Sequence, residues 1–169
     1  MNDHEQRQIF DEWFTRLKPL VSKIVRAFAF TASDQDDLFQ EIALQVWKSV
    51  PSFRNQSLVT TWLYRIGLNT AIKWSQKEKK HRRSAEPIEQ LEHLLRDETE
   101  TMDDRIAWIY EEIARLDVID RSIALLLLDG LSYREMSAIV GISESNVGVK
   151  INRIKKKLTE KSKNINHGI

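Results

Sequence analysis

The sequence contains no cysteine, which excludes disulfide bonds, thiolate metal sites and a cysteine nucleophile. Glycine and proline are scarce, at five and three among 169 residues. No stretch alternates apolar and polar residues in the way that a half-buried strand does. We therefore predict an all-α protein.

Long apolar stretches are also missing. The longest run, Ile123 to Leu128, is too short to cross a bilayer. The first residues, MNDHEQRQ, are polar where a signal peptide has an apolar core. We expect a cytoplasmic protein with no membrane insertion.

Residues arranged for chemistry are absent as well. No acid–base pair, nucleophile or glycine-rich phosphate loop emerges, so we predict no catalytic residues, no metal and no cofactor. The net charge is only +1, but nucleic-acid binding remains open because the placement of charge matters more than its sum. The four histidines are far apart, without helical metal-ligand spacing: His4, His81, His93 and His167.

Composition divides the chain into two helical domains, residues 1–83 and 105–163, joined by residues 84–104. The connecting stretch is rich in Asp and Glu, which predicts a flexible acidic linker that is also able to imitate nucleic acid. Pro19 is expected to kink the first helical segment or to break it into two helices. The tail, 159–169, loses its periodicity and is expected to fray.

A helix with an acidic start is predicted from Ser33, its expected cap, to the residue before Pro51. The acidic start, Asp34, Asp36 and Asp37, is either ordinary helix capping or part of an acidic docking surface for a basic protein. The face of the helix that would dock is Asp37, Gln40, Glu41 and Leu44. Its inner face is predicted as a buried stripe: Phe39, Ile42, Ala43, Val46, Trp47 and Val50.

The next segment combines a loop with a basic helix. Residues 51–57 favour a turn and carry Arg54, Asn55 and Gln56. In the following helix we expect these residues to pack inward: Trp62, Leu63, Ile66, Thr70 and Trp74. A polar row with a spacing of four is either a solvated face or a track for a nucleic-acid backbone: Arg65, Asn69, Lys73 and Lys77.

Residues 130–158 predict two helices joined by a tight turn, after a buried helix expected over Asp120–Leu128. Ser132 and Glu135 have capping-box spacing, Gly141 suits the turn, and Ser143 suits the second cap. The first helix has a short apolar stripe: Tyr133, Met136 and Val140.

The second of these helices has two faces. One is a stripe for burial: Val147, Ile151, Ile154 and Leu158. The other suits a helix that enters the major groove of DNA, with Lys150 and Lys157 at its flanks: Ser145, Asn146, Val149, Arg153 and Lys156. An amphipathic helix with a solvated basic face is the alternative, but the capped helix and glycine turn before it favour a DNA-binding helix-turn-helix.

Taken together, three stretches resemble the extracytoplasmic-function sigma factors of the sigma-70 family, the two-domain promoter-recognition subunits of bacterial RNA polymerase. They are DDLFQEIALQVW, TWLYRIGLNTAIKW and LSYREMSAIVGISESNVGVKINRIKKKL, in the family's order and spacing over about residues 8–160. Two positions depart from the family pattern. Gly148 stands where many members have a basic residue, and Ser137 stands where many have alanine.

The resemblance implies roles for the candidate residues. Asp37, Gln40 and Glu41 match the helix that docks on the clamp helices of the largest polymerase subunit. The loop with Arg54, Asn55 and Gln56 matches the one that captures a base flipped from the −10 element. The row implied to read the −10 element is Arg65, Asn69, Lys73 and Lys77. The residues implied to read the −35 element are Ser145, Asn146, Lys150, Arg153 and Lys156.

The implied partners are core RNA polymerase, through its two largest subunits, promoter DNA and an anti-sigma factor. Two other functions fit parts of the sequence. One is a helix-turn-helix activator that binds DNA without polymerase, although residues 1–83 show neither a ligand-binding α/β pattern nor heptads. The other is a helical adaptor that binds only protein.

Overall fold

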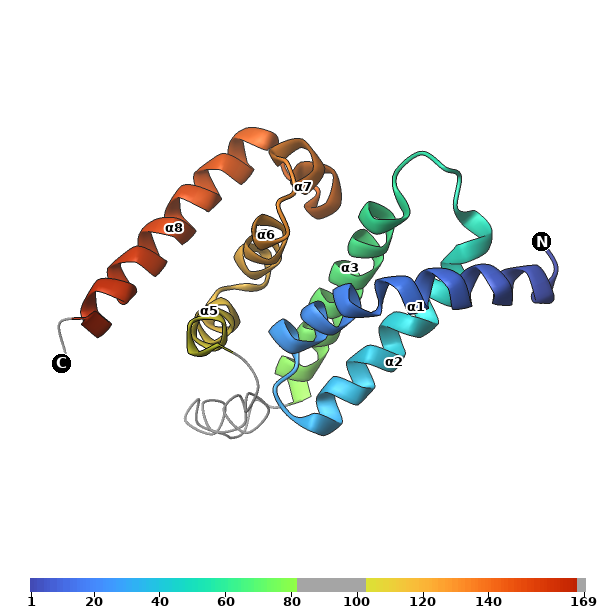
Figure 1. Cartoon of the computed structure of the whole chain (residues 1–169), viewed down its shortest axis with the longest axis horizontal. Coiled ribbons are helices and arrows are strands. Elements are labelled where there is room, and N and C mark those ends of the chain that lie inside the picture. Colours follow the sequence, from blue (N-terminus) through green and yellow to red (C-terminus); the bar gives the residue numbers. More distant parts are fainter. Residues whose placement is uncertain (82–102, 167–169) are drawn as a thin grey trace. The chain divides into compact units, whose positions relative to one another are not determined.

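The computed structural model describes residues 1–81 and 103–166, with side chains to residue 165. Within these ranges every regular element is a helix (Figure 1), which confirms the all-α prediction. The chain divides into two compact units, Met1–Glu111 and Glu112–Ile169. The predicted linker, 84–104, lies outside the described residues except for its last two positions. A membrane-spanning segment does not occur among the described helices, since each is too short or too polar for the bilayer core.

The first unit begins with α1 (Asp3–Phe28), whose first turn is closed by a capping box between Asn2 and Glu5. Of the two alternatives predicted at Pro19, a kink or a break, the break is wrong, because α1 continues through this residue. Proline removes the hydrogen bond to the carbonyl four residues earlier, here that of Thr15. Both residues are exposed, so water can satisfy that carbonyl.

The N-cap of helix α2 (Ala32–Ser49) lies two residues before the predicted cap. Thr31, not Ser33, is its N-cap, and the Thr31 hydroxyl accepts a hydrogen bond of 3.0 Å from the Asp34 amide. A short 3-10 turn, η1 (Val50–Ser52), follows directly. The buried stripe of α2 consists of Leu38, Ile42, Val46 and Val50. Leu38 was not part of the predicted stripe. Of the predicted stripe, Phe39, Ala43 and Trp47 are only half-buried at its edge.

Helix α3 (Val59–His81) packs against both α1 and α2. Its inward face differs from the prediction, since only Leu63 and Thr70 of the predicted set are buried. At the crossing with α1, a Cβ at Gly67 would lie 2.7 Å from Ile24 Cδ1. The other residues of the inward face are Tyr64, Leu68, Ala71 and Ser75.

Helix α5 (Asp104–Arg115) crosses the boundary between the two units and is followed by α6 (Val118–Leu128). Asp117 caps α6 by accepting hydrogen bonds from the amides of Ile119 and Asp120. The helix therefore starts two residues before the predicted start, Asp120. Arg121 fixes the corner, because its Nη2 donates to the carbonyls of Ala114 and Leu116 at 2.8 and 2.9 Å. The mainly apolar α6 is thereby anchored by a buried arginine.

The turn after α6 has the hydrogen bonds of a Schellman motif. Gly130, with φ of 75°, donates to the carbonyl of Leu127, and the next amide, of Leu131, donates to that of Leu126. Helix α7 (Tyr133–Val140) then starts with the predicted capping box of Ser132 and Glu135.

The predicted apolar stripe of α7 is largely wrong. Met136 and Ile139 are buried, whereas Tyr133 is 43% exposed and Val140 is half-buried. Gly141 ends α7 in the left-handed conformation, with φ of 80°, as predicted from its position in the turn.

Helix α8 (Glu144–Asn166) packs against α6 and α7. The predicted cap is confirmed, since Ser143 Oγ accepts a hydrogen bond of 3.1 Å from the Asn146 amide. The expectation of a frayed tail is wrong for residues 159–166, which continue the helix. Lys161 makes an ion pair with the buried Glu112 of α5, and this contact holds the end of α8 against the second unit.

Candidate nucleic-acid interface

The two predicted faces of α8 are present. Three residues of its apolar stripe are at most 1% exposed, namely Val147, Ile151 and Ile154, and Leu158 is half-buried. The opposite face is solvent-exposed: Ser145, Asn146, Val149, Arg153 and Lys156. The buried stripe fixes the rotation of α8, so the polar and basic side chains are directed away from the core.

Lys150 differs from the other residues predicted to read the −35 element. It is half-buried, and its Nζ lies 3.0 Å from Oδ1 of Asp120 on α6. Burial acts to raise the pKa of the adjacent Asp117. Backbone and side-chain hydrogen bonds with Asp120, the charge of Lys150 and the amide of Ile119 outweigh it and hold this pKa below its ordinary value. Lys150 is therefore part of an ionic cluster that joins α6 to α8.

Gly148 lies against an aromatic ring. A Cβ at this position would meet Tyr133 Cε2 at 3.4 Å, which is ordinary to tight contact. At Gly148, where many family members have a basic residue, the exposed ring of Tyr133 therefore occupies the adjacent space. This pairing has no local sequence signal, because the two residues belong to different helices.

Ser137 contributes more than small size. Its hydroxyl donates a hydrogen bond to the carbonyl of Ile142, in the turn between α7 and α8. Alanine has no group to make this bond, so the second departure adds a tie between α7 and the turn that orients α8.

In the first unit, the predicted docking residues are exposed along α2: Asp37, Gln40, Glu41 and Leu44. Glu41 accepts a hydrogen bond of 3.1 Å from the Gln45 amide group one turn later. The acidic face is thus separate from the buried stripe of Leu38 and Ile42, which leaves it free for a partner.

The basic row of α3 is exposed too, and it borders a groove of about 420 Å³ between α2 and α3. Glu41 and Gln45 lie on the α2 wall of this groove. Ile66 and Trp74, predicted to be core, instead line the groove and are half-buried. Three members of the row lie on the α3 wall: Asn69, Lys73 and Lys77. The structure therefore brings Glu41 of the acidic face and three residues of the basic row to one groove, which the sequence alone did not indicate.

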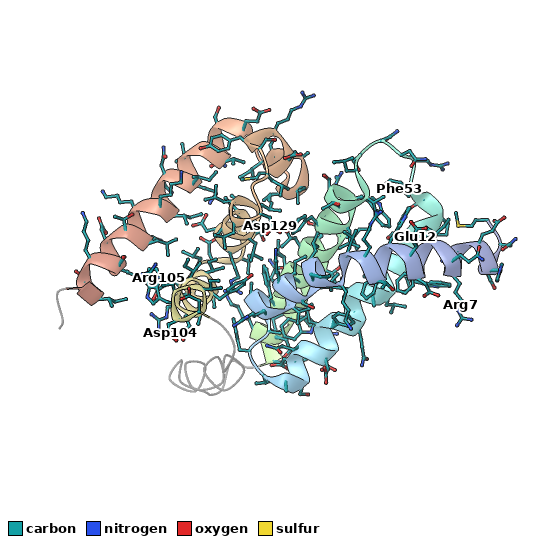
Figure 2. The ribbon with its side chains drawn as sticks, in the orientation of Figure 1. Arg7, Glu12, Phe53, Asp104, Arg105 and Asp129 are labelled. Atoms are coloured by element: carbon teal, nitrogen blue, oxygen red, sulfur yellow. The ribbon has the colours of Figure 1, made fainter. Side chains whose placement is uncertain are left out.

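The loop before α3 stands on a cluster of three aromatic rings. Phe53 lies between α1 and α3 (Figure 2), with ring centroids 5.0 Å from Trp13 and 5.2 Å from Trp62. Directly after it, Arg54, Asn55 and Gln56 are exposed. Asn55 has a φ of 56°, a left-handed conformation that asparagine tolerates better than most residues. A rigid base thus presents three hydrogen-bonding side chains in a sharply turned loop.

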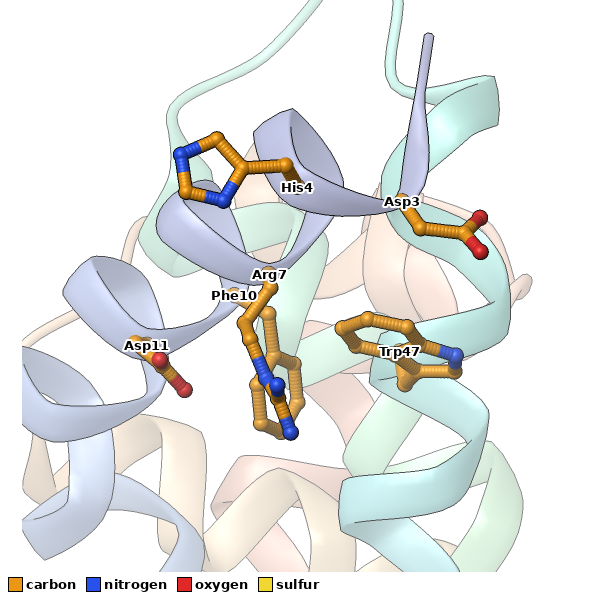
Figure 3. A pocket seen from close by; sticks show the side chains of 6 residues that line it. All are labelled: Asp3, His4, Arg7, Phe10, Asp11 and Trp47. Carbon is orange, nitrogen blue, oxygen red and sulfur yellow. The ribbon is translucent and has the colours of Figure 1, made fainter.

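A further hollow lies between the start of α1 and the end of α2 (Figure 3), with Phe10 and Trp47 as its aromatic lining and Arg7 at its side. Gln6 of α1 donates a hydrogen bond of 2.8 Å to the Trp47 carbonyl of α2. None of the residues predicted to bind polymerase or DNA lines this hollow. Among the described residues, no group of three or more His, Asp or Glu side chains is placed to hold a metal ion.

Comparison with known families accounts for both units. Residues 13–81 match the model of Sigma-70 region 2, and residues 106–158 match that of Sigma-70 region 4. The chain therefore belongs to the sigma-70 family. Within it, the chain is an extracytoplasmic-function sigma factor, which directs RNA polymerase to initiate transcription at specific promoters and is not an enzyme.

Two curated relatives extend over most of the chain. SigM of Mycobacterium tuberculosis is 26% identical over 164 residues, which is 96% of this chain and 82% of SigM. The sigma-E factor of Escherichia coli K12 is 26% identical over 167 residues, which is 92% of this chain and 87% of sigma-E.

Two solved structures share the fold. CnrH in complex with the cytosolic domain of CnrY is 24% identical, with a TM-score of 0.64 over 91% of this chain and 87% of CnrH. RpoE of Bartonella quintana, in complex with the anti-sigma factor NepR, is 16% identical, with a TM-score of 0.71 over 90% of this chain and 96% of RpoE.

Proposed function

We propose that the two predicted domains divide promoter recognition between them. Residues 1–83 dock on core polymerase and read the −10 element, residues 105–163 read the −35 element, and residues 84–104 are the tether. The observation that carries this proposal is the exposure of every predicted contact residue except Lys150, on faces that the core leaves uncovered. A tether makes the second binding event intramolecular, which raises its effective concentration without a new contact.

Docking on polymerase is assigned to the acidic face of α2. Asp37, Gln40 and Glu41 approach the clamp helices of the largest subunit, where opposite charge steers association and suppresses wrong partners. Asp37→Arg reverses one charge on an exposed position, so we expect loss of co-purification with core polymerase from an intact fold. Glu12→Arg, at an exposed acidic position on α1 (Figure 2), is the matched control and retains polymerase. Equal retention of polymerase by both variants contradicts the docking assignment.

Recognition of the −10 element is assigned to the loop and to the basic row of α3. Arg54, Asn55 and Gln56 offer donors and acceptors to an unpaired base, and a base held outside the stack is lost to the duplex. Binding energy thereby supports strand opening without nucleotide hydrolysis. The row then follows the adjoining backbone: Arg65, Asn69, Lys73 and Lys77.

Recognition of the −35 element is assigned to the exposed face of α8. Ser145 and Asn146, near the start of the helix, reach base edges, and Arg153 and Lys156 bind bases or phosphates. Lys150 remains on this surface in our proposal, but with a positioning role, because its ion pair with Asp120 holds α8 on α6.

The cellular setting follows from the relatives. Solved structures of CnrH with CnrY and of RpoE with the anti-sigma factor NepR support an anti-sigma partner for this chain, and we place the protein in the cytoplasm. Transcription in vitro with purified core polymerase, with 5′ ends mapped across a genomic template, tests the whole proposal. Defined start sites that require the protein support it. Binding to promoter duplex without polymerase in a gel shift would instead indicate an independent activator.

A further inference from the structure

The exposed face of α8 contains one apolar side chain among polar and basic ones. Val149 is 49% exposed, and it lies one helical turn after Ser145 and one turn before Arg153. Single apolar residues are common on protein surfaces. This one, however, lies in the middle of the row that we assign to the −35 element, where its neighbours have hydrogen-bonding groups.

The residue before Val149 is a glycine. Gly148 has no side chain, and the Tyr133 ring lies in the space next to it. Position 148 therefore has no long side chain that would hold Val149 away from a surface that α8 approaches. The Val149 side chain has neither donor nor acceptor, so it cannot recognise a base edge by hydrogen bonding.

Thymine is the base that presents a methyl group in the major groove, and apolar side chains contact that group. We propose that Val149 packs against the 5-methyl group of one thymine in the −35 element and thereby selects thymine at that position. This inference rests on the proposed role of α8 in reading the −35 element, and it adds which chemical group of which base is recognised.

Deoxyuridine provides the test, because it differs from thymidine only in lacking this methyl group. The holoenzyme is assembled from the full chain and core polymerase. Promoter duplexes in which each −35 thymine is replaced singly by deoxyuridine then compete with the unmodified duplex for binding to it. We expect one position at which the replacement weakens binding by about threefold to fivefold, the size given by burial of one methyl group.

Three variants then assign the effect to Val149. Val149→Ala removes the contact, so thymine and uracil bind equally at that position. Val149→Thr keeps a γ-methyl group and retains the discrimination. Ile165→Ala is the matched control, since Ile165 is 52% exposed on the same helix near its other end, and its thymine-to-uracil ratio is that of the wild type. Each ratio is measured within one variant, so general changes of affinity cancel.

The inference is overturned if no −35 thymine responds to loss of its methyl group, or if Val149→Ala keeps the full discrimination. Arg153→Ala in the same assay separates a failure of the role of Val149 from a failure of the proposed function of α8. If Arg153→Ala weakens −35 binding while methyl loss has no effect, α8 still reads the promoter and only the role of Val149 fails. If neither Arg153→Ala nor replacement of the −35 element changes binding, the proposed function of α8 fails as well.

Discussion

Substitution by alanine is expected to have opposite effects on stability at two glycines within helices, Gly67 and Gly148. At Gly67, the added Cβ of alanine would lie 2.7 Å from Ile24 Cδ1, about 1 Å inside the usual carbon–carbon contact distance. Ile24 is fully buried, so relief requires an unfavourable rotamer or a shift of α1 against α3. At Gly148, the nearest atom is 3.4 Å away and belongs to a half-exposed tyrosine.

The magnitudes follow from two effects. Overpacking a core costs about 1–3 kcal/mol, and alanine in place of a helical glycine gains about 1 kcal/mol. We therefore expect Gly67→Ala to destabilise the first unit by roughly 0–2 kcal/mol, as the difference of these effects. Gly148→Ala has the helical gain without the clash, so it stabilises the second unit by up to about 1 kcal/mol.

Ile24→Val isolates the clash, because valine lacks Cδ1. Alone it should cost about 0.5–1.5 kcal/mol. In the double variant, the next contact of the new Cβ is Ile42 Cγ2 at 3.9 Å, an ordinary distance. The two substitutions should therefore couple favourably by about 1–3 kcal/mol, the full overpacking cost.

The measurement is urea unfolding followed by tryptophan fluorescence, since Trp13, Trp62 and Trp74 all belong to the first unit. Free energies of unfolding of the wild type, the two single variants and the double variant complete a double-mutant cycle. Additivity within about 0.5 kcal/mol would refute the close approach of α1 and α3 at Gly67.

Three further predictions concern the second unit. Ser137→Ala removes the bond to the Ile142 carbonyl and should destabilise α7 and α8 by about 0.5–1.5 kcal/mol, measured by amide hydrogen exchange; unchanged exchange contradicts the tie. The lowered pKa of Asp117 means that its charge stabilises the fold fully above the ordinary aspartate pKa and progressively less as the pH falls through the lowered one. Asp117→Asn, which retains a capping oxygen, should therefore lose less stability on acidification than the wild type, and an equal loss would exclude this role. Arg153→Ala should weaken use of the −35 element by about 1–3 kcal/mol if it reads a base, or reduce the salt dependence if it binds phosphate. Run-off transcription at two salt concentrations distinguishes these results, and no change in either removes Arg153 from the interface.

Local signals predicted the ends of the C-terminal helices well. The capping box of Ser132 and Glu135, the turn at Gly141 and the cap at Ser143 are all formed within a few residues of chain. The buried stripe of α8 was also predictable, because its apolar residues have regular spacing and face one packed side. Such features need no knowledge of tertiary structure.

Errors arose where tertiary contacts decide burial. Periodicity selected Trp62, Ile66 and Trp74 as the inner face of α3, since large apolar residues carry the signal and glycine carries none. The actual crossing with α1 lies at Gly67, and it rotates α3 so that Ile66 and Trp74 line the groove instead. The break expected at Pro19 failed for a similar reason, because packing of the apolar residues that follow it holds the helix together.

Lys150 shows how the same limit affects the interface. The helical wheel places Lys150 at the flank of the exposed face of α8. Only the packing of α6 against α8 reveals that Lys150 makes an ion pair with Asp120, 30 residues earlier. An arginine or lysine in a recognition helix is therefore not a DNA contact by composition alone. On α8, Lys150 and Lys161 make ion pairs with Asp120 and Glu112, whereas Arg153 and Lys156 lie on the exposed face. Specificity then depends on the short side chains that precede them, because phosphate contacts position a helix whereas base contacts select the sequence.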